Sequence, residues 1–229
     1  MPDRPDALML FAAGLGTRMG ALTAQRPKPL IEVAGRPLID HALALAEGAG
    51  LGRIVVNTHY LPEQIAAHLA PRGLSLSHEP ELLETGGGLK AALPLLPSGA
   101  VFTLNSDAIW TGANPLAELR AAWDPARMDA LLLLIPPADA RGHAGQGDFL
   151  PDAAGRLRRA PGAIYSGAQI IKTAAVAAWP ERIFSLNRLW DSLIAEGRAF
   201  GTLHRGGWCD VGRPEGVGLA EALLAEADV

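Results

Sequence analysis

The side chains best suited to chemistry in this sequence are two aspartates, Asp107 and Asp210, and two cations, Arg18 and Lys28. Two carboxylates without an accompanying His or Cys pair form a hard oxygen site of the kind that Mg²⁺ prefers, with water and substrate phosphates as the other ligands. A guanidinium and an ammonium both suit phosphate oxygens. The four residues therefore predict a site for magnesium and phosphate, on condition that the fold brings the two aspartates together.

The surroundings of each aspartate allow more than one interpretation. Asp107 follows an apolar run of strand character at 101–104, so it can lie at a ligand-binding rim or simply cap the next turn. Asp210 lies in a Gly-bounded segment, 206–215, just before a predicted helix. The two positions are far apart in the sequence, and only the fold can decide between these alternatives.

The loop after the apolar run 8–11 consists of small residues and leads to the two cations. Glycines remove the Cβ that would block a phosphate, and successive backbone N–H groups can point at the anion. The loop is neither a dinucleotide fingerprint, since position 19 is Met, nor a P-loop, since no Gly-Lys-Ser/Thr follows. A glycine-rich turn alone also occurs in α/β proteins that bind no nucleotide. The prediction of triphosphate binding therefore depends on the whole span, with Ala12, Ala13, Gly14, Gly16, Thr17, Arg18 and Lys28 as its residues.

A second glycine-rich segment, Thr85 with Gly86, Gly87 and Gly88, follows the third predicted strand. Glycines that open a helix allow close backbone approach and leave free N–H groups. We expect this segment to contact the nucleotide. A flexible turn without ligand is the alternative.

The elements that must position these residues alternate between strand-length apolar runs and helical patterns. Runs that are apolar throughout, rather than at every second residue, are typical of strands covered on both faces. The pattern predicts an α/β fold: a three-layer, doubly wound, mostly parallel sheet, with ligands at the carboxyl ends of the strands. The loops after Phe11, Ser77 and Leu104 should therefore converge. The predicted strands are 8–11, 53–58, 74–77, 101–104, 130–135, 164–172 and 199–203, and the predicted helices are 39–50, 62–69, 88–96, 115–123, 186–196 and 214–226.

Residues 138–163 interrupt this regularity and are rich in Gly, Ala, Asp and Arg. We expect a small inserted β-ribbon here, within one domain that spans 1–229. The arginines at 156, 158 and 159 can steer a phosphate or form a solvated face, and the second is the commoner case. Trp123, Trp179 and Trp190 are expected to pack core helices, and Cys209 to be a small core residue.

Composition excludes several classes of function. The chain has 229 residues, 49% of them hydrophobic, and a net charge of −4, which argues against a surface that coats nucleic acid. A single cysteine excludes an internal disulfide. The N-terminal apolar run is too short for a signal sequence or a membrane span, so we expect a cytoplasmic protein without a membrane partner.

Taken over their full length, the motifs resemble those of the sugar-phosphate nucleotidyltransferases. The matching segments are Ala-Ala-Gly-x-Gly-Thr-Arg-Met with a later Pro-Lys-Pro-Leu, and Trp208 to Glu215. The resemblance implies that Asp107 and Asp210 hold a catalytic Mg²⁺ and that Thr85–Gly88 pack on the base. It also implies that Arg18 and Lys28 contact the phosphates. Asn105-Ser106 stands where the family often has glycine before the first Asp.

The Glu-Thr-Gly-Gly-Gly variant and the segment from Asn105 to Thr111 resemble a branch of small bacterial enzymes that join N-acetylmuramic acid 1-phosphate to UTP. This branch implies a role in peptidoglycan recycling. The Glu-Lys-Pro tripeptide that contacts the sugar phosphate in many relatives is missing. The candidates for sugar-phosphate binding are therefore Asn105, Asp148 and Gly167, of which the glycine can equally mark a bulge.

Several alternatives remain open at this point. The substrates can be a nucleoside triphosphate other than UTP with another sugar or polyol phosphate, for example GTP with mannose 1-phosphate. A nucleotide-sugar-binding module without turnover is a further alternative, which predicts loss of a carboxylate or cation that this chain retains. The oligomeric state, monomer or dimer, also stays open.

Overall fold

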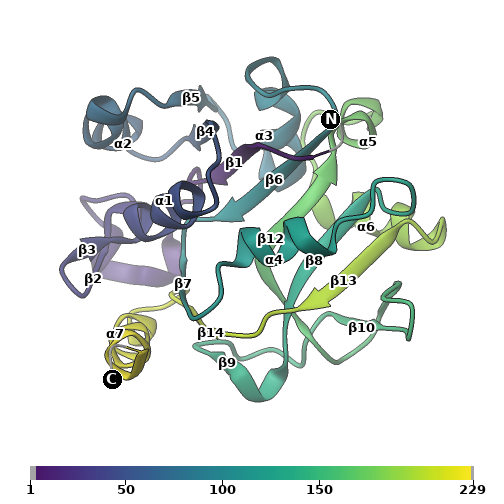
Figure 1. Ribbon diagram of the computed structural model, residues 1–229. Coiled ribbons are helices and arrows are strands. Elements are labelled where there is room, and N and C mark those ends of the chain that lie inside the picture. Colours follow the sequence, from purple (N-terminus) through teal and green to yellow (C-terminus); the bar gives the residue numbers. More distant parts are fainter. Residues whose placement is uncertain (1–3, 228–229) are drawn as a thin grey trace.

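The computed structural model describes residues 4–227, so the first three and last two residues of the predicted 1–229 domain lie outside the described residues. Its centre is a seven-stranded sheet (Figure 1). Strand β12 is antiparallel to both of its neighbours, and the other pairs are parallel. The strands, in spatial order, are β13 (Ala199–Leu203), β8 (Ala130–Ile135), β12 (Ile164–Lys172), β6 (Ala100–Asn105), β1 (Ala7–Phe11), β4 (Arg53–Thr58) and β5 (Ser75–His78).

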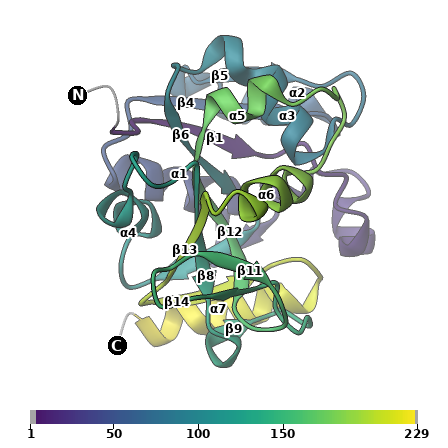
Figure 2. The same cartoon turned by 90° about the vertical axis from the view of Figure 1, so that its right-hand side faces the viewer.

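Helices cover both faces of this sheet (Figures 1 and 2), which explains why a central strand such as β8 is apolar throughout. One face packs against α1 (Leu38–Gly48), α2 (Pro62–Leu69) and α4 (Pro115–Ala122). The other face packs against α3 (Glu84–Ala92), α5 (Thr173–Ala178) and α6 (Leu186–Ala195). The predicted three-layer, mostly parallel α/β fold is therefore confirmed.

Local sequence signals set the ends of two of these helices. Asn114 precedes α4, and its side chain accepts hydrogen bonds from the backbone N–H groups of Leu116 and Ala117. Ser185 caps α6 in the same way. Helix α6 buries one stripe at helical spacing, formed by Leu186, Leu189, Trp190 and Leu193. Each such side chain contributes about 1.5–3 kcal/mol when fully buried, so this stripe holds α6 on the sheet.

A second, three-stranded sheet lies beside the carboxyl ends of the central strands. Its order is β7 (Ala108–Thr111), β14 (Gly207–Asp210) and β9 (Ala140–Arg141). Helix α7 (Glu215–Ala227) packs on this sheet and not on the central one (Figure 2). Neither β7 nor β14 is predicted as a strand from the sequence, although their pairing brings the two aspartates together.

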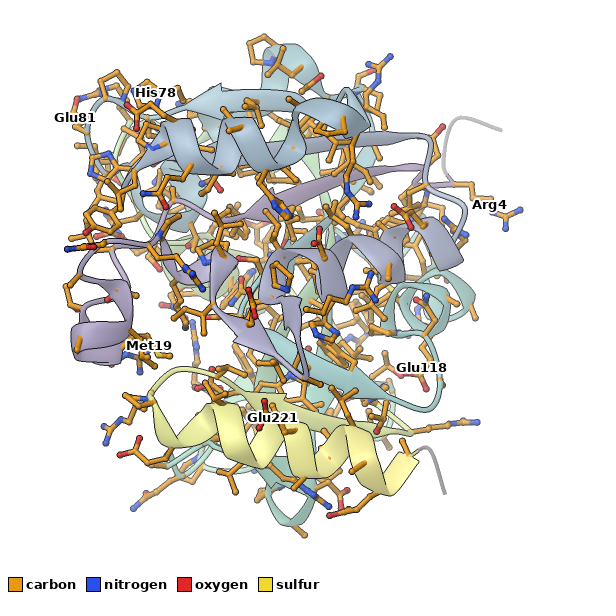
Figure 3. All side chains as sticks on the ribbon, turned by 90° about the vertical axis from the view of Figure 1, so that its left-hand side faces the viewer. Arg4, Met19, His78, Glu81, Glu118 and Glu221 are labelled. Carbon is orange, nitrogen blue, oxygen red and sulfur yellow. The ribbon has the colours of Figure 1, made fainter. Side chains whose placement is uncertain are left out.

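Short elements complete the fold. Glu221 of α7 points at the hairpin formed by β2 (Glu32–Val33) and β3 (Arg36–Pro37), where the Ala34 N–H donates to its Oε1 at 3.1 Å (Figure 3). Within the insertion predicted at 138–163, β10 (Phe149–Pro151) and β11 (Leu157–Arg159) form an antiparallel hairpin, whereas β9 joins the second sheet. The 3-10 helices are η1 (Thr17–Thr23), η2 (Lys28–Leu30), η3 (Ala70–Arg72), η4 (Leu93–Leu95) and η5 (Pro137–Asp139). Over residues 4–227, every helix is too short or too polar to cross a membrane.

Candidate active site

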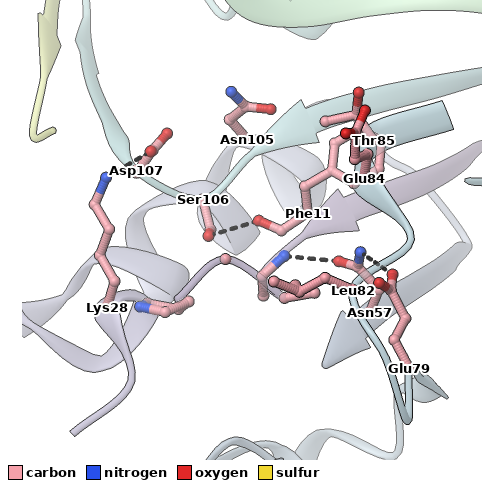
Figure 4. Close-up of a pocket in the computed structure, with 14 residues that line it drawn as sticks. Phe11, Lys28, Asn57, Glu79, Leu82, Glu84, Thr85, Asn105, Ser106 and Asp107 are labelled. Carbon is pink, nitrogen blue, oxygen red and sulfur yellow. Dashed lines mark hydrogen bonds and ion pairs between the residues drawn. The ribbon is translucent and has the colours of Figure 1, made fainter. Parts of the chain in front are cut away.

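A pocket opens where the carboxyl ends of β1, β4, β5 and β6 meet (Figure 4). The loops after Phe11, Ser77 and Leu104 contribute to it, as the sheet topology predicts. We call it the first pocket. Its lining residues are Phe11, Ala12, Ala13, Gly14, Lys28, Pro29, Asn57, Glu79, Leu82, Glu84, Thr85, Asn105, Ser106 and Asp107.

The small-residue loop contributes only its first half to this lining. Gly16, by contrast, serves the packing beneath the loop. Its φ is +65°, and a Cβ there would lie 2.9 Å from Thr23 Cγ2 and 3.0 Å from Lys28 Cβ. A side chain at this position would therefore displace Lys28. Arg18 is exposed on η1, and no hydrogen bond or ion pair engages it within residues 4–227.

Lys28 and Asp107 form an ion pair inside the pocket, with 2.6 Å between Nζ and Oδ2 (Figure 4). The lysine side chain is only 10% exposed. Ser106, the residue before Asp107, fixes the backbone here because its hydroxyl donates to the Phe11 carbonyl at 2.7 Å. This bond joins the ends of β1 and β6. The lysine charge therefore sits at a carboxylate whose backbone is fixed by two central strands.

The pairing of β7 with β14 brings Asp210 beside Asp107. Asp210 is opposite Ala108 in this ladder, and the Val211 N–H donates to the Asp107 carbonyl at 2.9 Å. Burial raises the pKa of Asp210, and the nearby Asp107 charge raises it further, while Lys28, Arg18 and His143 act in the opposite direction. The β7–β14 ladder and the Val211–Asp107 hydrogen bond therefore place the two aspartates side by side.

The carboxylate pair suits a hard divalent cation. The Asp210 carboxylate accepts no hydrogen bond from any other described residue, although much of it is shielded from water. No cluster of three or more His, Cys, Asp or Glu side chains with metal-binding geometry exists within 4–227. Two carboxylates are enough for Mg²⁺, which keeps several waters and takes substrate phosphates as its remaining ligands. The donor set therefore fits magnesium and does not fit a closed structural metal site.

The glycine segment after Thr85 differs from the prediction. Helix α3 begins at Glu84, so the three glycines lie inside it. The N–H groups of Gly86 and Gly87 both donate to the Phe184 carbonyl, at 2.9 and 3.0 Å. The expectation that these N–H groups are free is wrong, because the glycines admit the protein's own Phe184 against the helix: a Cβ on Gly86 would lie 2.3 Å from that ring. Of the predicted segment, only Thr85 lines the first pocket.

A second pocket adjoins the first and shares Phe11, Thr85 and Asn105 with it. Predicted residues Asn105 and Asp148 both line it. Gly167 does not, but a Cβ on it would lie 2.9 Å from the Asn105 side chain, and its φ is +89°. It stands in the β12 irregularity between Tyr165 and Gln169, so the glycine marks a bulge that makes room for Asn105. The remaining lining residues are Phe149, Tyr165, Ser185, Leu186, Asn187 and Trp190.

Aromatic rings form one side of the second pocket. Trp190 packs edge-on against Tyr165, with 4.7 Å between ring centroids, and its Nε1 donates to the buried Gln169 at 3.0 Å. Burial raises the pKa of Tyr165. Rings beside polar groups such as Asn105 and Asp148 suit a ligand with both apolar and hydroxyl faces. From the sequence, Trp190 is predicted only as a core residue and Asn187 is not predicted at all, because no spacing signal marks either as a pocket residue.

The other residues considered from sequence have structural surroundings. Arg159 donates from Nε to Asp191 at 2.8 Å and stacks over the Phe149 ring at 4.5 Å. Cys209 is buried, and burial raises the pKa of its thiol to about 11. Trp179 stacks on Phe184. These contacts agree with packing roles.

The comparisons with known proteins extend over nearly the whole chain. Residues 8–173 match the family described as the MobA-like NTP transferase domain. The N-acetylmuramate alpha-1-phosphate uridylyltransferase of Caulobacter vibrioides is 42% identical, over 99% of this chain and 100% of that protein. The protein of that name from Neisseria meningitidis is 33% identical, over 94% of this chain and 96% of its own.

Solved structures agree with the fold. The inositol-1-phosphate CTP transferase from T. maritima superposes with a TM-score of 0.80 at 14% identity, over 100% of this chain and 98% of that chain. At this identity the likeness concerns the fold alone. The family match covers well over half of the sequence, and the two relatives align along nearly their full length. The family predicted from the motifs is thus confirmed, and the chain belongs to the sugar-phosphate nucleotidyltransferases with a MobA-like NTP transferase domain.

Proposed function

We propose that this chain joins UTP to N-acetylmuramic acid 1-phosphate, giving UDP-N-acetylmuramic acid and pyrophosphate. The observation that carries the proposal is the junction of two pockets beside the pair Asp107 and Asp210. Two substrates that react phosphate to phosphate need adjoining sites with their charges neutralised at the junction. The names of the two full-length relatives support the choice of substrates.

In this proposal the first pocket takes the nucleotide. Ala12, Ala13 and Gly14 present a backbone without bulky side chains, and Thr85 with Leu82 forms the opposite wall. Small residues allow the backbone to approach a base or phosphate closely. Gly86, Gly87 and Gly88 support this wall from inside α3 and do not contact the base.

The second pocket takes the sugar 1-phosphate, with the sugar beside Trp190 and within reach of Asn105 and Asp148. A sugar offers an apolar face to a ring and hydroxyl or amide hydrogens to acceptors. Gly167 acts indirectly because it lets Asn105 occupy its place.

The reaction requires positioning and charge neutralisation more than proton transfer. An oxygen of the sugar phosphate attacks the α-phosphorus of UTP and forms a new P–O bond. The bond from the α-phosphorus to the oxygen that bridges it to the β-phosphorus breaks, and pyrophosphate is released. Phosphate is already a nucleophile near neutral pH, so no general base is needed. Lys28 neutralises charge at the α-phosphate, and Arg18, which is exposed and uncommitted to any described residue, contacts the departing pyrophosphate.

Magnesium would be held by Asp107 and Asp210, where it would supply positive charge to the phosphates at the junction. Lys28, which is paired with Asp107, would add its positive charge beside the same substrate phosphates. UTP and sugar phosphates are metabolites of the cytoplasm, which is where the proposal locates the enzyme.

The test is a matrix of purified protein with UTP, GTP, CTP or dTTP against three acceptors, followed by pyrophosphate release with Mg²⁺. The acceptors are the 1-phosphates of N-acetylmuramic acid, N-acetylglucosamine and mannose. We expect UTP with N-acetylmuramic acid 1-phosphate to give the highest kcat/KM. A preference for GTP with mannose 1-phosphate would refute the substrates, and no pyrophosphate from any pair would refute the enzyme.

Two variants control for contaminating activity. Asp210→Asn removes a proposed metal ligand and should abolish most of the release. Asp139→Asn removes the same charge at an exposed position on η5, away from both pockets, and should leave the release unchanged.

A further inference from the structure

A buried amide–carboxylate pair, Asn57 and Glu79, forms part of the lining of the first pocket (Figure 4). Asn57 is 3% exposed near the end of β4, and Glu79 is 1% exposed immediately after β5. Asn57 Nδ2 donates to Glu79 Oε1 at 2.7 Å. Neither residue belongs to the nucleotidyltransferase motifs of the sequence, and the proposed reaction assigns no role to either.

The pair connects the two walls of the pocket through one chain of hydrogen bonds. At one end, the Ala12 N–H donates to Asn57 Oδ1 at 2.7 Å. At the other end, the Leu83 N–H donates to Glu79 Oε2 at 3.1 Å. Ala12 is the first residue of the small-residue loop, and Leu83 immediately precedes α3. The walls that approach the nucleotide from opposite sides are therefore linked through two side chains.

Gly88 is part of the same arrangement. A Cβ on Gly88 would lie 2.5 Å from Glu79 Oε1 and 3.0 Å from Asn57 Nδ2. The glycine thus leaves room for the bonded pair against α3, which gives a physical reason for its position in the glycine segment.

Core stability alone does not explain this pair. No cation among the described residues forms an ion pair with Glu79, so a buried carboxylate is balanced only by N–H donors. Burying such a group is costly, and well-packed apolar residues of the same volume often give equal or greater stability. A fully satisfied polar network, by contrast, fixes the relative position of the groups that it joins.

We propose that Asn57 and Glu79 are positioning residues that hold the loop from Ala12 and the segment from Leu83 at the spacing that the nucleoside triphosphate requires. This inference rests on the proposed assignment of the first pocket to the nucleotide. The two side chains act through the backbone N–H groups at the two ends of the network. Neither side chain contacts the reacting atoms.

The polarity of the network makes a swap experiment possible. Glu79→Gln puts an amide donor opposite the Asn57 amide, and Asn57→Asp puts one carboxylate opposite another. Each single variant therefore loses one bond of the chain. The double variant Asn57→Asp/Glu79→Gln exchanges the amide and the carboxylate, so that donors and acceptors again match from the Ala12 N–H to the Leu83 N–H.

Two measurements are made on the wild type, on both single variants and on the double variant. Amide hydrogen exchange by NMR reports on the Ala12 and Leu83 N–H groups directly. Steady-state kinetics give the KM for UTP and, separately, the KM for the sugar phosphate. We expect each single to raise the KM for UTP about tenfold, the size of effect that one unsatisfied buried group produces. The KM for the sugar phosphate should change by less than about twofold, and the double should recover both UTP binding and amide protection.

Thr173→Val is the matched control. Thr173 is buried and exchanges two hydrogen bonds with Gly99, at 3.1 and 2.9 Å, at the opposite end of β6 from the pocket. It should lower the melting temperature without altering the KM for UTP. If it raises that KM as much as the single variants do, the pair has only a general structural role and the proposal is refuted.

The remaining outcomes separate this proposal from the proposed function. A double variant that stays as impaired as the singles would overturn the positioning role. If the wild type transfers no nucleotide, the function fails, and the network is then judged by amide exchange and by UTP affinity from calorimetry. In that case, amide hydrogen-exchange rates at Ala12 and Leu83 that are unchanged in the single variants would overturn the positioning role.

Discussion

Replacing Lys28 by methionine is the sharpest single perturbation of the proposed site. The lysine side chain is 10% exposed, so methionine retains most of its packing while the charge 2.6 Å from Asp107 disappears. Asp107 and Asp210 then face the substrate phosphates with one fewer cation. Removing one preorganised charge contact of this kind costs about 3–4 kcal/mol in the transition state, or about a hundred- to a thousandfold in kcat.

The assay is pyrophosphate release at saturating UTP and N-acetylmuramic acid 1-phosphate, with thermal unfolding measured in parallel. Arg26→Met is the matched control, because Arg26 is about half exposed and reaches Glu32 only at 4.0 Å. The control should retain its turnover, since exposed pairs contribute little. If the Lys28→Met variant is folded and its kcat is within about threefold of the wild-type value, the Lys28 charge does not stabilise the transition state as proposed.

Three further predictions follow from other parts of the structure. Gly167→Ala introduces a Cβ 2.9 Å from Asn105 at a φ of +89°, so it should lower kcat/KM for the sugar phosphate. It should also lower the melting temperature by about 2–8 °C, for a backbone cost of about 1–2 kcal/mol. Hydrogen bonds from Arg198, and then from Lys172, lower the pKa of Asp129, so their stabilisation is present at neutral pH and is lost as the pH falls below about 4. Arg198→Met should therefore lower the free energy of unfolding in urea at pH 7, and a deficit that persists undiminished at pH 3 would contradict this. Chelation by EDTA should stop pyrophosphate release, and added Mg²⁺ should restore it; full activity in EDTA would exclude the proposed metal.

The central sheet was predictable because burial on both faces leaves a clear record in the sequence. The strand β8, for example, is buried at every residue from Ala130 to Ile135, and its apolar run has the same bounds. Such runs need no knowledge of their partners. The three-layer arrangement then follows from the alternation of strands with helices.

The second sheet was not predictable in the same way. β7 and β14 are four residues each, and they pair across the chain from Ala108 to Asp210. A short strand beside Gly and Asp residues resembles a turn, and its stability comes from a distant partner and from α7. The sequence therefore indicated both aspartates as candidates, whereas their juxtaposition required the structure.

The glycine segment shows a related limit. Three consecutive glycines indicate close approach to something, and sequence alone cannot distinguish a ligand from the protein itself. In this chain the approaching groups are Phe184 for Gly86 and Glu79 for Gly88. Trp190 is the converse case, since a buried helix-face residue also lines a pocket.

A crystal structure of the protein with Mg²⁺ and UDP-N-acetylmuramic acid would test the assignment of the two pockets directly. Two adjoining pockets should hold the two halves of this one product. We predict uridine between the loop from Ala12 and Thr85, the sugar beside Trp190, and the diphosphate with its metal at Asp107 and Asp210. A sugar bound outside the second pocket, or phosphates remote from both aspartates, would contradict it.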